Sequence, residues 1–187
     1  MAEADVREAV ASDAAEIARI QVQTWETAYA EVLPPAVLAG LDTAEAEQEW
    51  REAVTSGAAT VLLAIEGRWT VGFCAAGLAP ESEVAAADGT LPEDSSTTVL
   101  VSALLVEPRW GRRGHAGRLL ATMGRRFTER GATRGITWVP ESDSASLSFY
   151  RSAGWDPDGT VRTLDAGGRP LREMRLTGPL DLELEHH

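Results

Sequence analysis

The spacing of apolar residues changes period along the chain, and these changes predict where helices and strands lie. Alternating or continuous apolar runs predict strands, whereas apolar residues three or four positions apart predict helices. The expected strands span residues 6–10, 60–67, 70–79, 97–106, 135–139, 155–164 and 171–176. Helices are expected after Asp13, from Pro35, after Thr43, after Gly114 and over residues 144–153. This order, with no internal repeat or linker, predicts a single α/β domain over residues 1–180.

Short polar signals refine this pattern. Asp13 followed by Glu16 is typical of a helix start, and Thr43 can cap the helix that follows it. Residues 80–96 are acidic and rich in turn formers, which predicts an exposed, mobile loop. The strand over residues 97–106 is apolar on both faces, so we expect it at the centre of the sheet.

Length and cysteine content limit the class of protein. The 187 residues are enough for one domain with a substantial core. Cys74 is the only cysteine, which excludes an internal disulfide and a Cys-x-x-Cys site, and we expect no bound metal. No apolar run approaches the ~20 residues needed to span a bilayer, and the first residues lack a signal-peptide layout. We therefore expect a cytoplasmic protein with no membrane partner.

Two features of composition concern the origin of the chain. Residues 184–187 resemble the remnant of a purification tag, which leaves His115 as the one native histidine. All 17 basic residues are arginine, and asparagine is missing as well. Lysine and asparagine have AT-rich codons, so this composition indicates a GC-rich genome, and we expect a bacterial source.

Charge is distributed unevenly along the chain. The net charge of −12 argues against nucleic-acid binding, which needs a basic surface to displace counterions. Residues 1–105 hold 4 arginines against 18 acidic residues, whereas residues 106–135 hold 8 arginines against 2 acidic residues. A basic segment in an acidic chain predicts a small anionic ligand at one place.

The basic segment contains a glycine-rich turn between a strand and a helix, "VEPRWGRRGHAGRLL" from Val106 to Leu120. The first N–H groups of a helix lack internal partners, and the helix dipole places partial positive charge there. With little side-chain bulk at Gly114, Ala116 and Gly117, a diphosphate could approach these amides closely. The turn is neither a G-x-G-x-x-G fingerprint nor a P-loop, which needs a lysine. The alternative is a plain turn with a solvated arginine cluster.

The same residues, "LLVEPRWGRRGHAGRLL", resemble the acetyl-CoA-binding motif of GCN5-related N-acetyltransferases (GNAT). In that family a strand ending in L-x-V-x-P leads into roughly R/Q-x-x-G-x-G/A and then an apolar helix. The family's second signature, N-x-x-A-x-x-F-Y-x-x-x-G-F, resembles "DSASLSFYRSAGW" from Asp143 to Trp155. Both motifs occur in the family's order and separation, and the surrounding pattern of strands and helices agrees from Val6 to Leu176.

Four positions depart from the family pattern. Gly111 stands at the Arg/Gln position, with the arginine moved to Arg112. Asp143, Ser146 and Trp155 stand where asparagine, alanine and phenylalanine are usual. A carboxylate at position 143 would repel a bound anion, and its alternative role is a helix N-cap, which aspartate performs well.

The resemblance implies an α/β (α+β) fold: a mixed, mostly antiparallel sheet of six to seven strands flanked by helices, with a splayed central strand. It implies acetyl-CoA as cosubstrate, with the exposed edge of Leu104, Leu105 and Val106 bonded to the pantetheine arm. The other residues that it assigns to coenzyme A are Arg112, Arg113, Gly114, His115, Ala116, Gly117 and Asp143. Family members often dimerise through their C-terminal strands, and on the sequence alone both a homodimer and a monomer stay open for this protein.

The implied reaction is direct attack by an amine on the acetyl thioester. A backbone N–H near Val106 would stabilise the oxyanion, and Tyr150 would give a proton to the departing thiolate. Alternatively, Tyr150 only packs beside Phe149. The strand over residues 97–106 offers no carboxylate or histidine as a general base, which leaves four candidates open: Glu26, Glu31, Glu81 and Glu83.

The acceptor is an unidentified amine, either a small molecule or an amino group of a protein or peptide. Trp25 and Tyr29, one helical turn apart, would line its cleft or else pack in the core. The acidic N-terminal half favours a cationic acceptor over an anionic one. Two other functions stay open on the sequence alone: a non-catalytic acyl-CoA-binding regulatory module with the same fold, and a nucleotide-binding protein.

Overall fold

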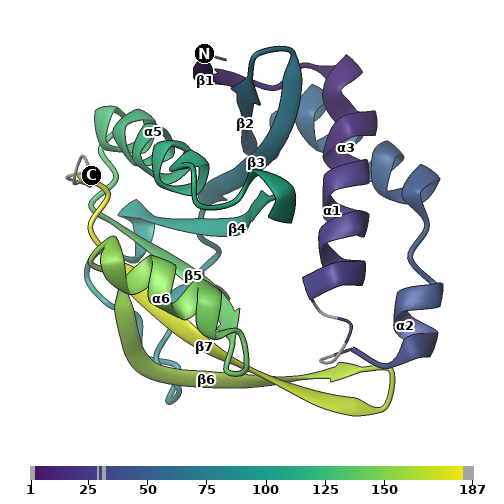
Figure 1. The fold of residues 1–187 in the computed structure, drawn as a ribbon. Coiled ribbons are helices and arrows are strands. Elements are labelled where there is room, and N and C mark those ends of the chain that lie inside the picture. Colours follow the sequence, from purple (N-terminus) through teal and green to yellow (C-terminus); the bar gives the residue numbers. More distant parts are fainter. Residues whose placement is uncertain (1–2, 29, 31–32, 183–187) are drawn as a thin grey trace.

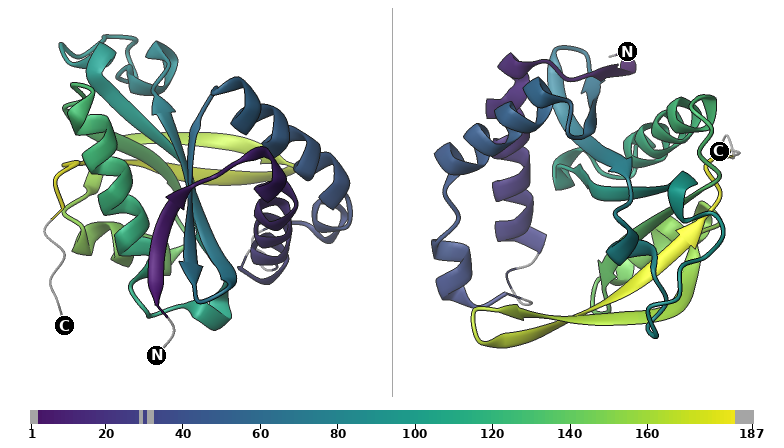
Figure 2. Two further views of the ribbon diagram at one scale, coloured as in Figure 1. Left: turned by 90° about the horizontal axis from the view of Figure 1, so that it is seen from above. Right: turned by 180° about the vertical axis from the view of Figure 1, so that it is seen from behind.

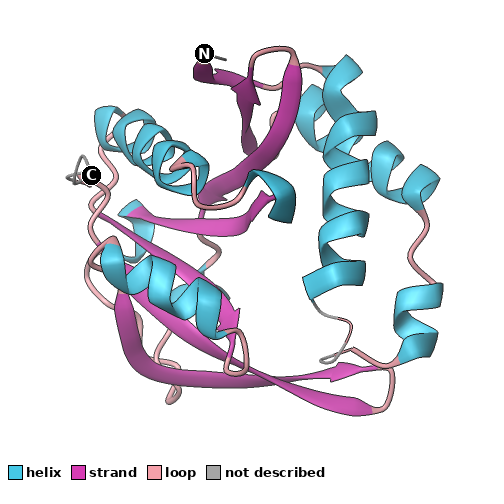
Figure 3. Ribbon diagram, in the orientation of Figure 1, coloured by secondary structure: helices cyan, strands magenta, loops and turns pink. Residues whose placement is uncertain are grey.

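The computed structural model describes residues 3–28, 30 and 33–182, and its centre is one seven-stranded sheet (Figure 1 and Figure 3). The strands are β1 (Ala4–Glu8), β2 (Thr60–Glu66), β3 (Trp69–Leu78), β4 (Thr98–Val106), β5 (Arg134–Pro140), β6 (Asp156–Ala166) and β7 (Arg169–Gly178). Their order in the sheet is β1-β2-β3-β4-β5-β7-β6, with β4 and β5 parallel and the other pairs antiparallel. The expected mixed, mostly antiparallel sheet is confirmed, with β4 at its centre.

Helices cover both faces of this sheet. They are α1 (Ala14–Ala28), α2 (Pro35–Ala39), α3 (Thr43–Ser56), α4 (Glu81–Val84), α5 (His115–Glu129) and α6 (Ser144–Ser152). Helices α5 and α6 lie on one face, while α1 and α3 lie on the other (Figure 2). The helical spacing of Leu119, Met123 and Phe127 gives α5 its buried side, and Ile17 and Ile20 do the same for α1.

Alternation along β2 and β3 separates the two apolar layers. Leu62 and Cys74 face α5 and α6, whereas Leu63 and Phe73 face α1 and α3, and all four are fully buried. Trp50 of α3 meets Phe73 edge-on, with the ring centroids 5.1 Å apart. The inner strands are therefore buried on both faces, which explains their nearly continuous apolar runs.

Strand β4 parts from β5 partway along its length. It pairs with β3 as far as Val106, but its ladder with β5 covers only Thr98–Leu100. Just beyond this ladder, the Thr137 hydroxyl donates to the Val101 carbonyl oxygen at 2.8 Å. Residues 102–106 of β4, all within the described chain, therefore have no ladder partner on the β5 side, which confirms the splayed central strand.

A β-bulge lies where the two strands diverge. The register between β3 and β4 shifts at Ala75–Ala76, opposite Ser102, whose hydroxyl donates to the Ala75 carbonyl oxygen at 3.2 Å. Bulges bend a strand and increase its local twist. The bend comes two residues after Leu100, the last residue of the β4–β5 ladder. It therefore lies at the point where β4 turns away from β5.

The second sequence motif ends on a tryptophan that fits against two glycines. Trp155 is fully buried, and its indole nitrogen donates to the Pro179 carbonyl oxygen at 2.8 Å. A Cβ at Gly135 or at Gly178 would overlap this ring. The large ring at position 155 is therefore accommodated because both neighbouring strands carry glycine beside it.

Three local expectations need correction. Strand β1 lies two residues earlier than expected and ends at Glu8. The Asp13 carboxylate accepts from the preceding Val10 N–H at 2.8 Å, in a 3₁₀ turn that precedes α1. Asp42, rather than Thr43, caps α3 with its carboxylate. Where several neighbouring residues can cap a helix, the backbone angles decide which of them becomes the N-cap. The sequence pattern does not show these angles.

The segment expected to be an exposed, mobile loop, residues 80–96, is mostly exposed. It also contains the short helix α4, in which Val84 is only 2% exposed. The Arg175 side chain of β7 donates from Nη1 to the carbonyl oxygens of Glu83 and Ala85, both at 2.9 Å. The segment is thus bonded to the sheet through an arginine from a distant part of the chain.

Gly178→Ala is expected to lower the free energy of unfolding by about 1–3 kcal/mol, because the added methyl group overlaps the Trp155 ring in a filled core. Gly77→Ala is the matched control, since a Cβ there meets only the Ala58 carbonyl oxygen at an ordinary 3.6 Å. Urea unfolding followed by circular dichroism measures both variants. Equal unfolding midpoints for Gly178→Ala and wild type would contradict the packing described for Trp155.

The Cys74 thiol is expected to be inert in the folded protein. It has no exposed surface, and burial raises the pKa of this thiol to about 12. Because the thiolate is the reactive form, Ellman's reagent should leave the native protein unmodified and titrate this thiol after unfolding in urea. Rapid colour development with the native protein would show that the side chain is accessible.

Candidate active site

The second half of β4 presents an open backbone edge. The Glu107 N–H donates to the Val71 carbonyl oxygen of β3 at 2.9 Å. Because N–H groups alternate between the two edges of a strand, those of Leu104 and Val106 point away from β3. They point to the side that β5 has left, where an extended ligand can add as a further strand.

The side chains of this edge belong to opposite layers. Leu104 and Val106 pack on the layer of α5 and α6, whereas Leu105 packs on the layer of α1 and α3. Gly72 of β3 lies opposite Val106, and a Cβ there would be 2.6 Å from the Leu105 carbonyl oxygen. The three residues that the sequence assigned to the pantetheine arm thus lie together, on a stretch that β3 supports closely.

The chain passes from β4 into α5 through an unusual turn. After a 3₁₀ turn over Pro108–Trp110, both Arg112 and Gly114 adopt the left-handed region, with φ angles of 61° and 79°. This region is ordinary for glycine, but uncommon for other residues and typical of functional turns. Gly114 is the N-cap of α5, and no side chain in the described part of the chain caps this helix. Its first N–H groups can therefore bind an anion.

Glu66 holds two of the side chains that the sequence assigned to the coenzyme. Its carboxylate accepts from Arg113 and from His115, each at 2.7 Å. These bonds, above all the one from His115, hold the pKa of Glu66 below its usual range. The structure thus keeps Arg113 and His115 in the turn but directs both side chains at a carboxylate at the end of β2.

A second carboxylate, that of Glu107, binds the other end of the turn. Its side chain is 2% exposed and lies 2.7 Å from Arg19 of α1 and 3.0 Å from Arg109. The sequence analysis missed this residue, although a lone acidic side chain between a strand and a basic turn is a signal for such a pairing. Glu107 joins the end of β4 to α1 and to the turn.

Arg112 differs from the other arginines of the turn. Its side chain is exposed and takes part in none of the ion pairs found among the described residues. Arg113 is paired with Glu66, and Arg109 with Glu107. Among these three, Arg112 is therefore the arginine whose charge is still available to a ligand.

Asp143 caps α6, as its alternative role predicts. Its carboxylate accepts from the Ser146 N–H at 3.1 Å and from the Ser146 hydroxyl at 2.7 Å. Two departures from the sequence motif, at positions 143 and 146, thus bond to each other. Both oxygens of the carboxylate are used within the helix start.

Tyr150 lies on the buried side of α6. It is 5% exposed and packs between Phe149 and Trp155, with ring centroids 5.2 Å and 5.4 Å away. It belongs to the same apolar layer as Leu104 and Val106 of the open β4 edge. The second sequence motif is thereby brought to the face of the sheet on which the first motif's helix lies.

The four candidate bases fall in different surroundings. Glu83 accepts from the Trp138 indole nitrogen at 2.6 Å and pairs with Arg162 at 3.3 Å, so its carboxylate is already engaged. Glu26 and Glu81 are exposed. Glu31 lies outside the described residues, as does Tyr29 of the proposed aromatic pair.

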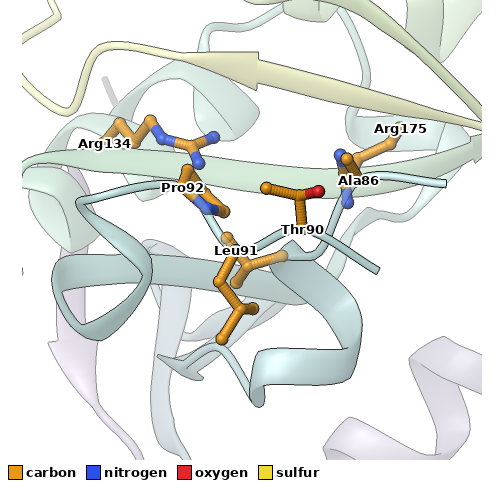
Figure 4. Close-up of a pocket in the computed structure, with 7 residues that line it drawn as sticks. Ala86, Thr90, Leu91, Pro92, Arg134 and Arg175 are labelled. Carbon is orange, nitrogen blue, oxygen red and sulfur yellow. The ribbon is translucent and has the colours of Figure 1, made fainter. Parts of the chain in front are cut away.

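Two cavities flank the sheet without touching the open edge. One, of about 250 Å³, lies between α1 and α3 and is lined by Trp25 together with Asp42, Glu45 and Glu49. The other, of about 280 Å³, lies between residues 84–92 and the side chains of Arg134 and Arg175 (Figure 4). Arg134 lies opposite Thr98 in the β4–β5 ladder, at the end of β4 that is farther from the open edge. The second cavity is therefore remote from residues 102–106.

The described residues contain no group of three or more His, Cys, Asp or Glu side chains that could hold a metal ion. None of their helices is long and apolar enough to cross a membrane.

Comparisons with known proteins agree with this geometry. The model of the acetyltransferase (GNAT) family matches residues 20–155. YuaI, an uncharacterized N-acetyltransferase of Bacillus subtilis, is 30% identical over 177 residues, which cover 93% of this chain and 92% of that protein.

Solved structures share the fold at low sequence identity. The PaiA N-acetyltransferase of Thermoplasma acidophilum, in complex with coenzyme A, has a TM-score of 0.74 at 13% identity, covering 95% of this chain and 99% of that one. YncA of Salmonella typhimurium, with its cofactor acetyl-CoA, has a TM-score of 0.68 at 19% identity, covering 99% and 98%. With a family model that spans both sequence motifs and a relative aligned along nearly its whole length, the chain belongs to the acetyltransferase (GNAT) family.

Proposed function

We propose that this acetyltransferase binds acetyl-CoA along the open edge of β4 and transfers the acetyl group to an amine. The observation that carries the proposal is the continuity of residues 102–106, which lack a β5 partner, with the uncapped start of α5. An extended arm and a diphosphate are joined in the same order in coenzyme A. The coenzyme A and acetyl-CoA present in two similar structures support this assignment.

The backbone makes most of the proposed contacts to the coenzyme. The N–H groups of Leu104 and Val106 bond to the pantetheine arm, as a neighbouring strand would. The diphosphate lies at the N–H groups of His115, Ala116 and Gly117, where the helix dipole favours negative charge. Arg112 supplies the nearby side-chain charge. The Asp143 carboxylate supports the site by capping α6 through Ser146.

The proposed reaction is direct transfer. The acceptor nitrogen bonds to the acetyl carbon, the carbon–sulfur bond breaks, and the amine proton passes to solvent. A backbone N–H near Val106 faces the developing oxyanion, where a fixed donor lowers the barrier. Tyr150 protonates the departing thiolate and recovers its proton from solvent. Its place in the apolar layer of Leu104 and Val106 supports this role.

The surroundings of the site favour some acceptors and settings over others. The acidic N-terminal half and the cavity between Trp25, Glu45 and Glu49 support an acceptor with additional positive charge. The edge strand β6, with Val161 and Leu164 exposed by 42% and 40%, supports a homodimer through that edge. The proposal includes a bacterial, cytoplasmic setting, of which the relative from Bacillus subtilis supports the bacterial source.

Tyr150→Phe is expected to lower kcat by roughly 100-fold or more while the Michaelis constant for acetyl-CoA stays close to wild type. The variant keeps the ring between Phe149 and Trp155 and removes only the hydroxyl. Thiol release from acetyl-CoA with a panel of amines, peptides with free amino termini and aminoglycosides measures turnover. Unchanged turnover with every acceptor that the wild type uses would exclude Tyr150 as the acid.

Gly114→Val is expected to weaken coenzyme A binding at least about tenfold, because the side chain blocks the approach to the amides of α5. Gly89→Val is the matched control for backbone strain, since Gly89 also has a positive φ, of 86°, but lies in open space. Isothermal titration with coenzyme A measures both. Equal affinities in two folded variants would remove the diphosphate from this turn.

A further inference from the structure

His115 is an unusual residue for the first position of a helix, because its ring is buried and bonded at both nitrogens. It is 2% exposed, with Nε2 2.7 Å from a Glu66 carboxylate oxygen and Nδ1 3.0 Å from Arg118 Nη2. The proposed reaction uses only the backbone N–H of this residue. The side chain therefore needs a separate explanation.

The partners fix the tautomer of the ring. An arginine side chain has only donors, so Nδ1 of His115 accepts from Arg118 and carries no proton. In this neutral ring the proton then lies on Nε2, which donates to Glu66. The imidazole thus accepts a hydrogen bond from the Arg118 guanidinium of α5 and donates one to the Glu66 carboxylate of β2.

The connected guanidinium lies against the turn itself. Arg118 Nη2 also donates to the Arg113 carbonyl oxygen at 3.1 Å, and Nη1 would be 3.0 Å from a Cβ at Gly114. Arg113 and Gly114 immediately precede the amides to which the diphosphate is assigned. Glu66, which accepts from His115, also pairs with the Arg113 side chain at 2.7 Å. The buried ring thus bonds to Glu66 and Arg118, and these two side chains bond to the side chain and the carbonyl oxygen of Arg113 in the turn.

We propose that His115 is a positioning residue for the diphosphate turn and acts by presenting Nδ1 to Arg118. This inference rests on the proposed function of the turn. Arg118 holds the Arg113 carbonyl, and Glu66 holds the Arg113 side chain, so the turn keeps its left-handed residues in place before any ligand arrives. A site held in its binding geometry loses less conformational freedom on binding.

The two polar ends of the imidazole can be separated by substitution. In His115→Asn the amide oxygen can occupy the place of Nδ1 and accept from Arg118, but the side chain is too short to reach Glu66. In His115→Gln the amide nitrogen can occupy the place of Nε2 and donate to Glu66, but nothing accepts from Arg118. The inference predicts that His115→Gln weakens coenzyme A binding roughly tenfold, and clearly more than His115→Asn does.

A double-mutant cycle tests whether His115 acts through Arg118. Titration with coenzyme A is carried out on wild type, His115→Gln, Arg118→Ala and the double variant, each confirmed as folded by thermal melting. Since His115 acts through Arg118, His115→Gln should cost nothing further once Arg118 is alanine. If His115→Gln does not fold, His115→Ala replaces it in the cycle, because it also removes the acceptor for Arg118, and the expected result is then a change of less than about twofold in the Arg118→Ala background.

Kinetics and a shortened ligand give independent readouts. His115→Gln should raise the Michaelis constant for acetyl-CoA while kcat stays close to wild type, and it should not alter binding of pantetheine, which lacks the diphosphate. Additive effects in the cycle, or equal losses for pantetheine and coenzyme A, would overturn the positioning role and leave the proposed function standing. Failure of wild type to bind coenzyme A would overturn the proposed function and this inference together.

Discussion

The separation of β4 from β5 is the constraint on which the rest of the site depends. A central strand normally has both edges bonded, and an unpaired edge inside a sheet leaves backbone groups without partners. Here the contacts with β5 end at Val101, so the five residues 102–106 lead into the turn with one edge open. The parallel pairing of β4 and β5 places α5 in the connection between them, and its uncapped start follows directly from that open edge.

Charge at the turn is arranged less simply than the arginine-rich sequence indicates. Glu107, at the start of the turn, pairs with Arg109. Glu66, at the end of β2, pairs with Arg113. Much of the positive charge is therefore used to fix the backbone, and its attraction for an anion is reduced. In such an arrangement selectivity for phosphate comes mainly from oriented amides, whose number and direction are set by the fold.

The sequence was informative where one local pattern decides the structure. Apolar spacing located every strand and the main helices, and two motifs identified the open edge, the turn and α6. It failed where partners are distant: Arg175 bonds residues 83 and 85 from 90 or more positions away, and Glu66 meets His115 across 49 positions. No local pattern indicates such pairs. The motif located the turn but did not show that the side chains of Arg113 and His115 bond to the Glu66 carboxylate.

The backbone conformation of Arg112 lowers the stability of the turn, while its side chain adds positive charge there. A non-glycine residue with a φ of 61° holds about 1 kcal/mol or more of unfavourable backbone energy, which glycine at the same position would avoid. Glycine there would also remove the turn's exposed, unpaired cation. Arg112→Gly would therefore relieve backbone strain and remove this cation in one step, so the stability of the turn and its positive charge are coupled at one position.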